Sequence, residues 1–289
     1  DYLGHAKPNS QHDQVEQVSS SAWPLADVFE QHIFPTFLAV KIDRYSQTRD
    51  IPSIKGTSGI SPYLAAGLIS PRYVLRQLLN LNPDMLIATD SANFSWLNEI
   101  IWREFYRHLL YHEQRLCKHE CFNLKYQGVT WSNDSEKFEA WKAGKTGYPL
   151  VDAAMRQLNQ TGWMHNRLRM VVASFLTKHL LIDWRWGEKY FMNKLIDGDL
   201  ASNNGGWQWA ASTGCDAQPY FRIFNPIRQS ERFDPKGDFI RMYLPELEYI
   251  PDKEIHFPHA YMNKHSLNLY WPAIVEHKTA RLQALNFYK

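Results

Sequence analysis

Apolar residues recur at helical spacing along most of this 289-residue chain, and this periodicity limits its fold more than any other feature. Few segments alternate apolar and polar residues as strands do, and no repeat of fixed period indicates a solenoid. The chain is long enough to bury a substantial core. We therefore predict an all-α fold, with helices over residues 24–44, 61–79, 93–113, 135–143, 148–160, 164–182, 187–196 and 271–286.

Residues 1–22 differ in composition from the rest of the chain. They are polar, rich in Ser and Gln, and nearly without apolar anchors, which is typical of a linker. The helical periodicity begins only at Trp23. We expect residues 1–22 to be an interdomain linker that follows a further segment, and residues 23–289 to form one α-helical domain.

Charge and cysteine content exclude several classes of protein. The 32 basic and 30 acidic residues leave a net charge of +2, so any contact with nucleic acid must come from a local patch. Three cysteines in so long a chain do not form a disulfide scaffold, and they favour a reducing compartment, the cytosol or an organelle interior. No apolar run approaches the ~20 residues of a membrane-spanning helix.

Three short motifs are excluded by their spacing. The sequence GKT at Gly144–Thr146 lacks the first glycine of a phosphate loop, since Glu139 stands there. The sequence DGDLASNN opens like a calcium loop, but Gln208 replaces the glutamate required at the twelfth position. Cys117 and Cys121, with nearby histidines, do not have the spacing of a closed zinc site. We predict no metal site, and we interpret GKT as the end of a helix.

The stretch KGTSGISPYLAAG carries the signals of a helix start. Ser61 stands at a predicted N-cap and Pro62 at the first helical position, and the hydroxyls of Thr57 and Ser58 precede them. Free backbone N–H groups and the helix dipole at such a start favour a phosphate or diphosphate. The alternative is an ordinary capped helix that binds nothing.

The stretch WLNEIIWREFYRH predicts a helix with Trp96, Glu99, Arg103 and Tyr106 on one face. One interpretation is an exposed ion pair between Glu99 and Arg103 beside core aromatic residues, worth only ~0.3–0.5 kcal/mol. The other is the wall of a pocket. The sequence pattern is the same in both cases.

A second helical stretch, GWMHNRLRMVVASFL, interrupts what should be a buried face with polar groups. Its stripe contains Asn166, Arg169, Met170 and Ala173. Asp197 and Asp199 could supply the partners that these polar groups need, because both stand in the run IDGDLASNNGGWQWAASTG at Ile196–Gly214. We interpret that run as a loop between helices whose Gly and Asn residues let the backbone approach a flat ligand.

Together with the residues that follow them, these stretches resemble the FAD-binding domain of the photolyase/cryptochrome family, in particular class I cyclobutane pyrimidine dimer photolyases. The resemblance extends from about Trp23 to the C-terminus. It implies an all-helical catalytic domain that holds FAD in a U-shape beside a cavity open to DNA. We expect the N-terminal α/β antenna domain of the family to be absent from this chain. A full-length protein could also carry an antenna chromophore, a folate or a deazaflavin, which this chain alone would not bind.

The resemblance also assigns residues to the cofactor. Asn203 would face flavin N5, Arg169 and Asp197 would pair beside the isoalloxazine, and Gly205–Gly206 would give the backbone a sharp turn. Gly59 stands where many relatives carry a larger, often basic residue. The full set of expected FAD contacts is Tyr45, Thr57, Ser58, Gly59, Ile60, Ser61, Trp96, Arg103, Asn166, Arg169, Asp197, Gly198, Asp199 and Asn203.

The reaction implied by the resemblance is light-driven electron transfer from reduced FAD to a pyrimidine dimer in damaged DNA. The dimer is rotated out of the duplex, as is known for photolyases. Glu99 would hydrogen-bond the dimer, Asn203 would contact the flavin, and Trp131, Trp184 and Trp207 would form an electron relay. The expected DNA and dimer contacts are Arg49, Glu99, Trp102, Arg103, Tyr106, Asn166, Arg167, Met170, Trp209, Arg222 and Gln229.

Two other functions remain open, a cryptochrome-type blue-light photoreceptor without repair activity and a flavin-free helical interaction domain. Asn203 favours repair, because many plant-type photoreceptors carry an acid at the matching position. Asn166 and Met170 stand where relatives that repair the (6-4) lesion have a histidine pair, so the resemblance implies cyclobutane dimers. We expect a monomer without membrane contact, in the bacterial cytoplasm or in an organelle interior or nucleus.

Overall fold

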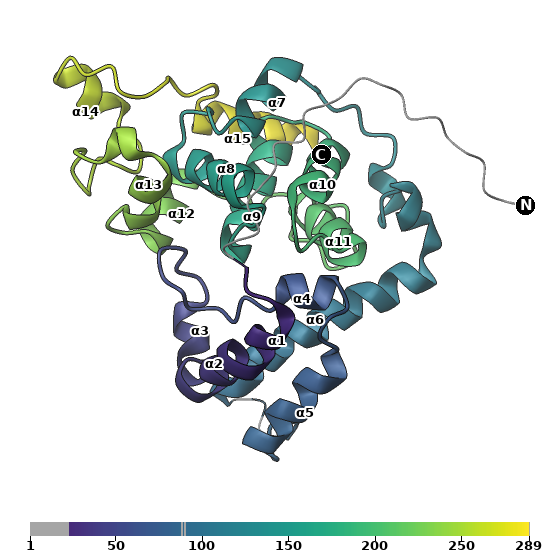
Figure 1. Ribbon diagram of the computed structural model, residues 1–289. Coiled ribbons are helices and arrows are strands. Elements are labelled where there is room, and N and C mark those ends of the chain that lie inside the picture. Colours follow the sequence, from purple (N-terminus) through teal and green to yellow (C-terminus); the bar gives the residue numbers. More distant parts are fainter. Residues whose placement is uncertain (1–22, 88, 90, 289) are drawn as a thin grey trace, which may run out of the picture.

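The computed structural model describes residues 23–87, 89 and 91–288, and within them it contains helices and no strand (Figure 1). The predicted all-α fold is therefore confirmed. The predicted linker over residues 1–22 lies outside the described residues. In the same part of the chain, no helix combines the length and apolar character needed to cross a membrane.

The first third of the chain forms a small helical unit, the N-terminal region, which lies at the bottom of Figure 1. Its core is apolar and aromatic, with Phe34 packed against Phe29 and Trp96 at ring-centroid distances of 6.1 and 5.7 Å. A π-helical turn over Phe29–Ile33 joins the first two α-helices. The α-helices of this region are α1 (Ala26–Val28), α2 (Phe34–Val40), α3 (Tyr45–Thr48), α4 (Ser61–Ala65) and α5 (Pro71–Leu81).

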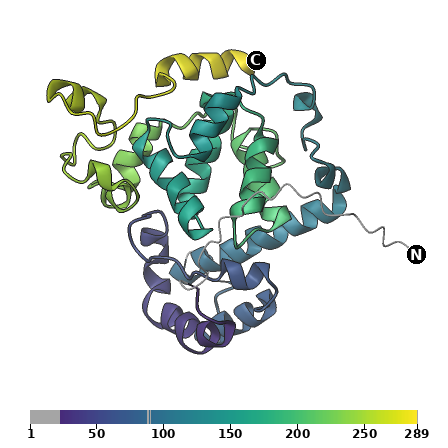
Figure 2. The same ribbon diagram turned by 45° about the horizontal axis from the view of Figure 1, so that its top comes forward.

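The rest of the chain forms the larger C-terminal region, in which α8 is surrounded by other helices (Figure 2). Contacts join α8 to α7, α9, α12 and α13, and α10 packs along α11. The helices are α7 (Ser135–Lys142), α8 (Pro149–Thr161), α9 (Asn166–Ser174), α10 (Trp184–Lys194), α11 (Leu200–Ala210), α12 (Pro226–Phe233), α13 (Asp238–Tyr243), α14 (His259–Lys264) and α15 (His277–Phe287).

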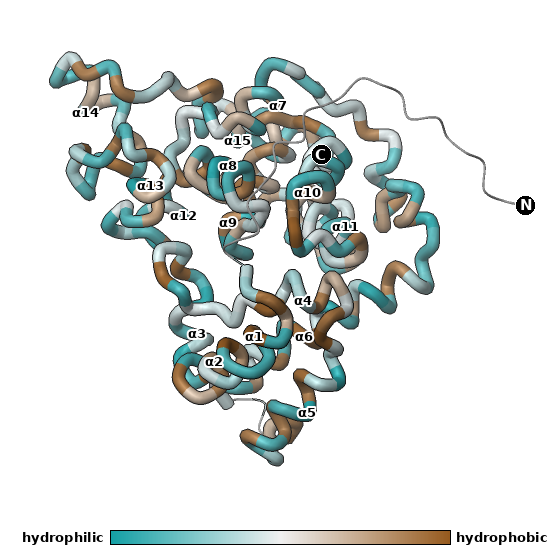
Figure 3. The backbone as a smooth tube through the Cα atoms, in the orientation of Figure 1, coloured by the Kyte–Doolittle hydropathy of each residue, from teal (hydrophilic) through white to brown (hydrophobic). Residues whose placement is uncertain are grey.

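Helix α6 (Ala92–His112) joins the two regions, since it contacts α3 and α5 on one side and α11 on the other. Ser91 begins it, because the Ser91 side chain accepts a hydrogen bond from the backbone N–H of Phe94. Hydropathy changes within the helices rather than from one helix to the next (Figure 3), as expected for amphipathic helices around shared cores. In α5, for example, Val74 and Leu78 are fully buried.

Most predicted helices are present, with altered ends. The helix predicted over 61–79 is two helices. The first ends at Ala65, and the second begins at Pro71 with Ser70 as its N-cap. The helix predicted over 271–286 begins only at His277. Helices α12, α13 and α14 were not predicted, since six to eight residues carry too little periodicity to be detected. Helix α7 ends just before Gly144, as the interpretation of GKT required.

The interpretation of Ile196–Gly214 as a loop is wrong, because α11 occupies its centre. Gly205 and Gly206 lie inside that helix and make no sharp turn. A Cβ on Gly205 would lie 2.2 Å from the Tyr106 ring, so glycine is required for α11 to approach α6. A Cβ on Gly206 would meet no atom within 4 Å. Gly205 therefore allows close packing of α11 against α6, whereas Gly206 borders open space, and neither glycine makes a turn.

Candidate functional site

Two adjoining cavities lie where the N-terminal and C-terminal regions meet. The large cavity has a volume of ≈ 410 Å³ and the small cavity ≈ 280 Å³, sizes that suit a ligand or cofactor. The two cavities share part of their linings. The shared residues are Arg49, Glu99, Arg103, Asn166, Arg169, Asp197, Asp199 and Ser202.

The small cavity is lined by the segment Thr57–Ser61, together with Tyr45, Trp96 and Trp163. Gly59 has a φ of +69° and a Cβ there would meet nothing within 4 Å, so the backbone is exposed to the cavity. The predicted N-cap is one residue off, because Ile60 precedes α4 and no side chain caps it. Ser58 instead accepts from the backbone N–H of Ile60 at 3.4 Å. Since α4 has only five residues, hydroxyls rather than a helix dipole characterise this wall.

Helix α6 forms a wall of the large cavity with Glu99, Trp102, Arg103 and Tyr106. The interpretation of this helix face as a pocket wall is confirmed. The ion pair between Glu99 and Arg103 does not form, because each side chain has a better partner nearby. Arg103 pairs with Glu104 at 2.6 Å and donates to the Leu64 carbonyl at 3.2 Å.

Glu99 pairs instead with Arg49 from the N-terminal region, at 2.7 Å between Nη1 and Oε1. Burial raises the pKa of the Glu99 carboxyl, and the Arg49 guanidinium opposes that rise. Burial likewise raises the pKa of the neighbouring Tyr106 hydroxyl to about 12. The large cavity therefore has a partly desolvated acid whose charge depends on one arginine.

Helix α9 brings its predicted stripe to the large cavity, with Asn166, Arg169, Met170 and Ala173 all in the lining. The partner expected for Arg169 is confirmed, since its Nη2 donates to both carboxylate oxygens of Asp197 at 2.8 and 3.0 Å. The Arg169 Nε also donates to the Met164 carbonyl at 2.9 Å. A carboxylate whose side chain is only 3% exposed is thus paired at the junction of the two cavities.

Helix α11 adds Asn203, Gly206, Trp207 and Trp209 to the large cavity. Asp199 precedes it as the N-cap and accepts from the backbone N–H of Ser202 at 3.0 Å. Burial alone would raise the pKa of this carboxyl, but the hydrogen bonds from Ser202 and Arg107 lower it. Asn203, Trp207 and Trp209, which the sequence motif singled out, therefore line the large cavity from a helix rather than from a loop.

Several predicted site residues lie away from both cavities. Arg167 pairs with Asp50 at 2.8 Å and stacks 4.5 Å above the Phe233 ring, because it points away from the stripe of α9. Trp131 and Trp184 are buried in the core of the C-terminal region, whereas Trp207 lines the large cavity. The predicted site residues outside both linings are Trp131, Arg167, Trp184, Gly198, Arg222 and Gln229.

Several residues in or beside the two cavities were not predicted. Trp163 lines the small cavity, and its Nε1 is buried without a hydrogen-bond partner in the protein. Arg107 lies in neither lining but pairs with Asp199 at 2.6 Å, and its place one turn after Arg103 on α6 was the available signal. Additional residues of the linings are Leu64, Ala65, Ile100, Met164, Phe191, Leu195 and Asp216. Among the described residues, no group of three or more His, Cys, Asp or Glu side chains could hold a metal ion.

Comparisons with known proteins agree on one family. The family model described as the FAD binding domain of DNA photolyase matches residues 96–289. The deoxyribodipyrimidine photo-lyase of Escherichia coli is 58% identical over 246 residues, which cover 85% of this chain and 52% of that protein. The protein of the same name from Vibrio cholerae is 56% identical over 253 residues, covering 88% and 53%. The chain spans about half the length of the curated relatives it matches.

Solved structures give the same result. A bacterial class III photolyase from Agrobacterium tumefaciens superposes with a TM-score of 0.84 at 44% identity, covering 92% of this chain and 55% of that one. A cryptochrome from Synechocystis sp. PCC6803 superposes with a TM-score of 0.81 at 33% identity, covering 91% and 55%.

Proposed function

Because this chain belongs to the family of FAD-binding domains of DNA photolyases, we propose that it binds FAD in the two adjoining cavities and repairs cyclobutane pyrimidine dimers in DNA under light. One observation carries the proposal. The Arg169–Asp197 pair stands at the junction of a hydroxyl-lined small cavity and an aromatic, partly open large cavity. A dinucleotide and a base-sized substrate could therefore meet there.

The small cavity fits the phosphate, ribityl and adenine parts of FAD. Thr57, Ser58 and Ser61 bring hydroxyl donors, and the Trp163 Nε1 is an N–H donor that the protein leaves without a partner. The exposed backbone at Gly59 allows close approach of a ligand. These features support the proposed assignment of Tyr45, Trp96 and the segment Thr57–Ser61 to the cofactor.

The large cavity fits a flat ring system on one side and a pair of bases on the other. Trp102 is 38% exposed and Trp209 lies across the cavity on α11, so two indole faces are available for stacking. FAD would supply the absorption of light and the electron that opens the cyclobutane ring. The side chains of the protein would orient the substrate, exclude water and stabilise charge in the cavity.

Glu99 is the proposed hydrogen-bonding partner of the dimer carbonyls. Its carboxyl lines both cavities, and burial raises its pKa. If the Arg49 guanidinium moved away from it, the protonated form, which can donate a hydrogen bond, would be favoured. Arg49 is the proposed contact for a DNA phosphate at the rim. Phosphate binding by Arg49 and donation by Glu99 are thus compatible roles.

The choice of lesion rests on α9. Asn166 and Met170 line the large cavity side by side and neither is an acid that could protonate a leaving hydroxyl. A cyclobutane dimer needs only electron transfer and bond scission, so it suits an amide and a polarizable thioether. The (6-4) lesion needs a proton donor that this wall does not contain.

The electron relay and the outer DNA contacts are also proposals. Trp207 lines the cavity, and Trp184 and Trp131 are buried in the same core, which supports a path toward the surface. Arg222 and the two exposed arginines of α12, Arg228 and Arg232, support a local basic patch on a nearly neutral chain. The similarity to the Synechocystis cryptochrome favours, as a second candidate, a photoreceptor that does not repair DNA.

Illumination of two defined substrates tests the function. The chain is loaded with FAD, reduced chemically and exposed to blue light with oligonucleotides that contain one cyclobutane thymine dimer or one (6-4) photoproduct. We expect intact thymines from the first substrate only, with a dark sample as control. Recovery of thymines from the (6-4) substrate alone would refute the assignment of the lesion. Bound FAD without repair of either substrate would favour the photoreceptor.

A further inference from the structure

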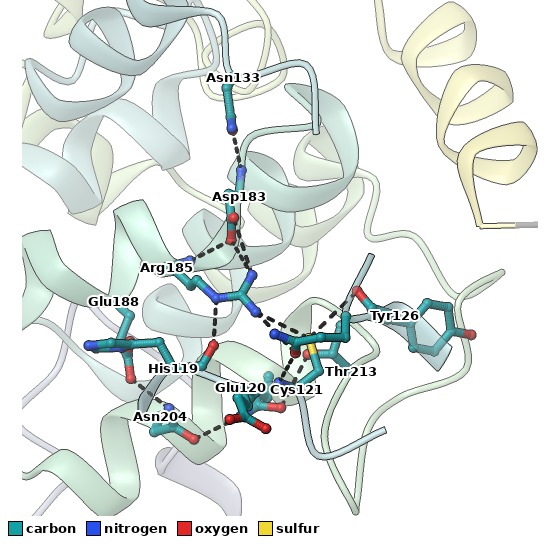
Figure 4. Close-up of polar contacts among 12 residues, drawn as sticks. His119, Glu120, Cys121, Tyr126, Asn133, Asp183, Arg185, Glu188, Asn204 and Thr213 are labelled. Atoms are coloured by element: carbon teal, nitrogen blue, oxygen red, sulfur yellow. Dashed lines mark hydrogen bonds and ion pairs between the residues drawn. The ribbon is translucent and has the colours of Figure 1, made fainter. Parts of the chain in front are cut away.

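Glu188 on α10 is an acid with 1% exposure that lines neither cavity, yet both its backbone carbonyl and its carboxylate contact α11. Figure 4 shows its carboxylate beside Asn204. Its backbone carbonyl accepts from Nδ2 of Asn203 at 2.9 Å. Its carboxylate accepts from Nδ2 of Asn204 at 2.8 Å. Two consecutive asparagines of α11 therefore donate hydrogen bonds to one residue of α10.

The preceding residue explains how α10 comes so close. A Cβ on Gly187 would lie 2.1 Å from the Trp207 ring, so only glycine lets that ring rest on the backbone of α10. Trp207 itself lines the large cavity. The close contact at Gly187 thus brings the Glu188 carbonyl within reach of Asn203.

This contact fixes which end of the Asn203 amide faces the cavity. A backbone carbonyl can only accept a hydrogen bond, so the amide nitrogen must be the end that contacts Glu188. The Oδ1 oxygen then lies at the other end of a side chain that lines the large cavity. The wall consequently presents an acceptor, which prefers a ligand nitrogen that carries a proton.

The carboxylate of Glu188 is in turn anchored from the surface. Nδ1 of His119 lies 2.9 Å from Oε2, and the His119 side chain is 56% exposed. Nε of Arg185 donates to the His119 carbonyl at 2.6 Å and holds that residue, whose φ is +60°. The network continues on α11, where Gln208 donates to Oδ1 of Asn204 at 2.8 Å.

We propose that Glu188 is a positioning residue for Asn203, and that its carboxylate, clamped between His119 and Asn204, keeps the Asn203 oxygen directed at the cavity. The ligand class that this orientation selects is a ring whose nitrogen facing Asn203 carries a hydrogen. If that nitrogen is flavin N5, reduced FAD carries a hydrogen there and oxidised FAD does not. The proposal rests on the proposed function for the identity of that ligand. The clamp itself is a property of the protein without FAD.

Two measurements test the clamp. The first is the ratio of affinities for reduced and oxidised FAD, taken from the midpoint potential of the bound cofactor. The second uses the FAD-free chain labelled with ¹⁵N-asparagine, in which the side-chain amide signals of Asn203 report its bond to Glu188. The signals are identified by their loss in Asn203→Asp.

Four variants are compared with the parental chain. Glu188→Ala should lower the preference for reduced FAD about tenfold, about 30 mV for a two-electron couple, and move the Asn203 amide signals toward those of free asparagine. Glu188→Gln should stay within twofold, because its amide can accept from Asn204 and donate to His119. His119→Ala, a change at an exposed side chain, should cause a loss of about threefold and keeps the test valid if Glu188→Ala does not fold.

Glu276→Ala is the matched control, an acid that accepts hydrogen bonds from Lys278 and Thr279 at the start of α15, far along the chain from the clamp. It should change neither readout. Parental preference and parental Asn203 signals in Glu188→Ala and His119→Ala would overturn the proposal, as would equal losses in Glu276→Ala. If the parental chain binds no FAD, the proposed function fails, and the Asn203 signals of the FAD-free chain still decide the clamp.

Discussion

The two regions that enclose the cavities have different kinds of core. In the described N-terminal region, Ser58 is the single buried polar side chain, and aromatic and aliphatic groups fill the rest. The C-terminal region buries many polar and charged groups. They include Asp152, His165, Lys178, His179, Glu188, Asp197, Asn204, Gln208, Asp234 and His256.

This difference separates shape from electrostatics at the site. The N-terminal region contributes hydroxyls and backbone to the small cavity, and its one charged contribution to the two linings is Arg49, at the end of α3. The C-terminal region contributes Arg169, Asp197 and Asn203, whose orientations depend on hydrogen bonds within that region. The C-terminal region should therefore be the part whose stability depends on buried polar partners and on pH.

The largest expected effect is the loss of a buried carboxylate in the C-terminal region. Asp152 accepts from the backbone N–H groups of Thr146 and Gly147, and from the side chains of Thr146, Tyr270 and Trp271. Asp152→Ala would leave these donors without a partner and should lower the free energy of unfolding by about 3–5 kcal/mol. Urea unfolding followed by circular dichroism measures it.

The control for that prediction is Glu139→Ala, an acid whose side chain is 68% exposed on α7. It should change the free energy of unfolding by no more than about 0.5 kcal/mol. A loss below about 1 kcal/mol in Asp152→Ala would mean that buried polar groups do not distinguish the C-terminal core.

A smaller effect is expected from the apolar core of the N-terminal region. Phe34 is fully buried and packs on Phe29 and Trp96, so Phe34→Leu should cost about 1–2 kcal/mol through lost contacts. No buried ionisable group is involved. The cost should be equal at pH 6 and pH 9, and a clear dependence of this cost on pH would contradict an apolar, pH-independent core.

The pH dependence should come from Lys178, which is fully buried and donates to the Arg222 carbonyl at 3.2 Å. Burial lowers the pKa of its ammonium from 10.5 to about 7. Between these values the unfolded chain binds the proton and the folded chain does not, so stability rises with pH. The slope from this group is at most about 1.4 kcal/mol per pH unit.

Lys178→Met should remove that slope while keeping the volume of the side chain. The measurement is the free energy of unfolding of both chains from pH 7 to pH 10, with their difference isolating Lys178 from other titrating groups. The variant should be relatively more stable at pH 7 than at pH 10. A difference that stays constant over this range would show that Lys178 is charged in the folded protein.

The sequence predicted the helical class and most cavity residues because the necessary signals are local. The polar stripe of α9 and the face of α6 each lie within one helix, where spacing determines which side chains meet. The alternative interpretation, an ion pair between Glu99 and Arg103, was wrong because it also considered only residues within one helix. The true partner, Arg49, is fifty residues away along the chain and enters through packing of α3 on α6.

Helix α11 shows the other limit. Two glycines and two asparagines lower its helix propensity, and the contacts that stabilise it come from Tyr106 on α6 and from Gly187 and Glu188 on α10. Such contacts exist only in the folded chain. The residues of the site were therefore predictable from the motif, whereas the helix that positions them and its anchor at Glu188 were not.

Hydrogen exchange of the chain with and without FAD tests most directly whether both regions form one cofactor site. A titration should reach saturation at one FAD per chain. Exchange should then slow in residues 56–65 of the N-terminal region and in residues 197–207 of the C-terminal region, because the two cavities adjoin at the Arg169–Asp197 pair. Protection confined to one of the two regions, or no saturable binding of FAD, would contradict the account.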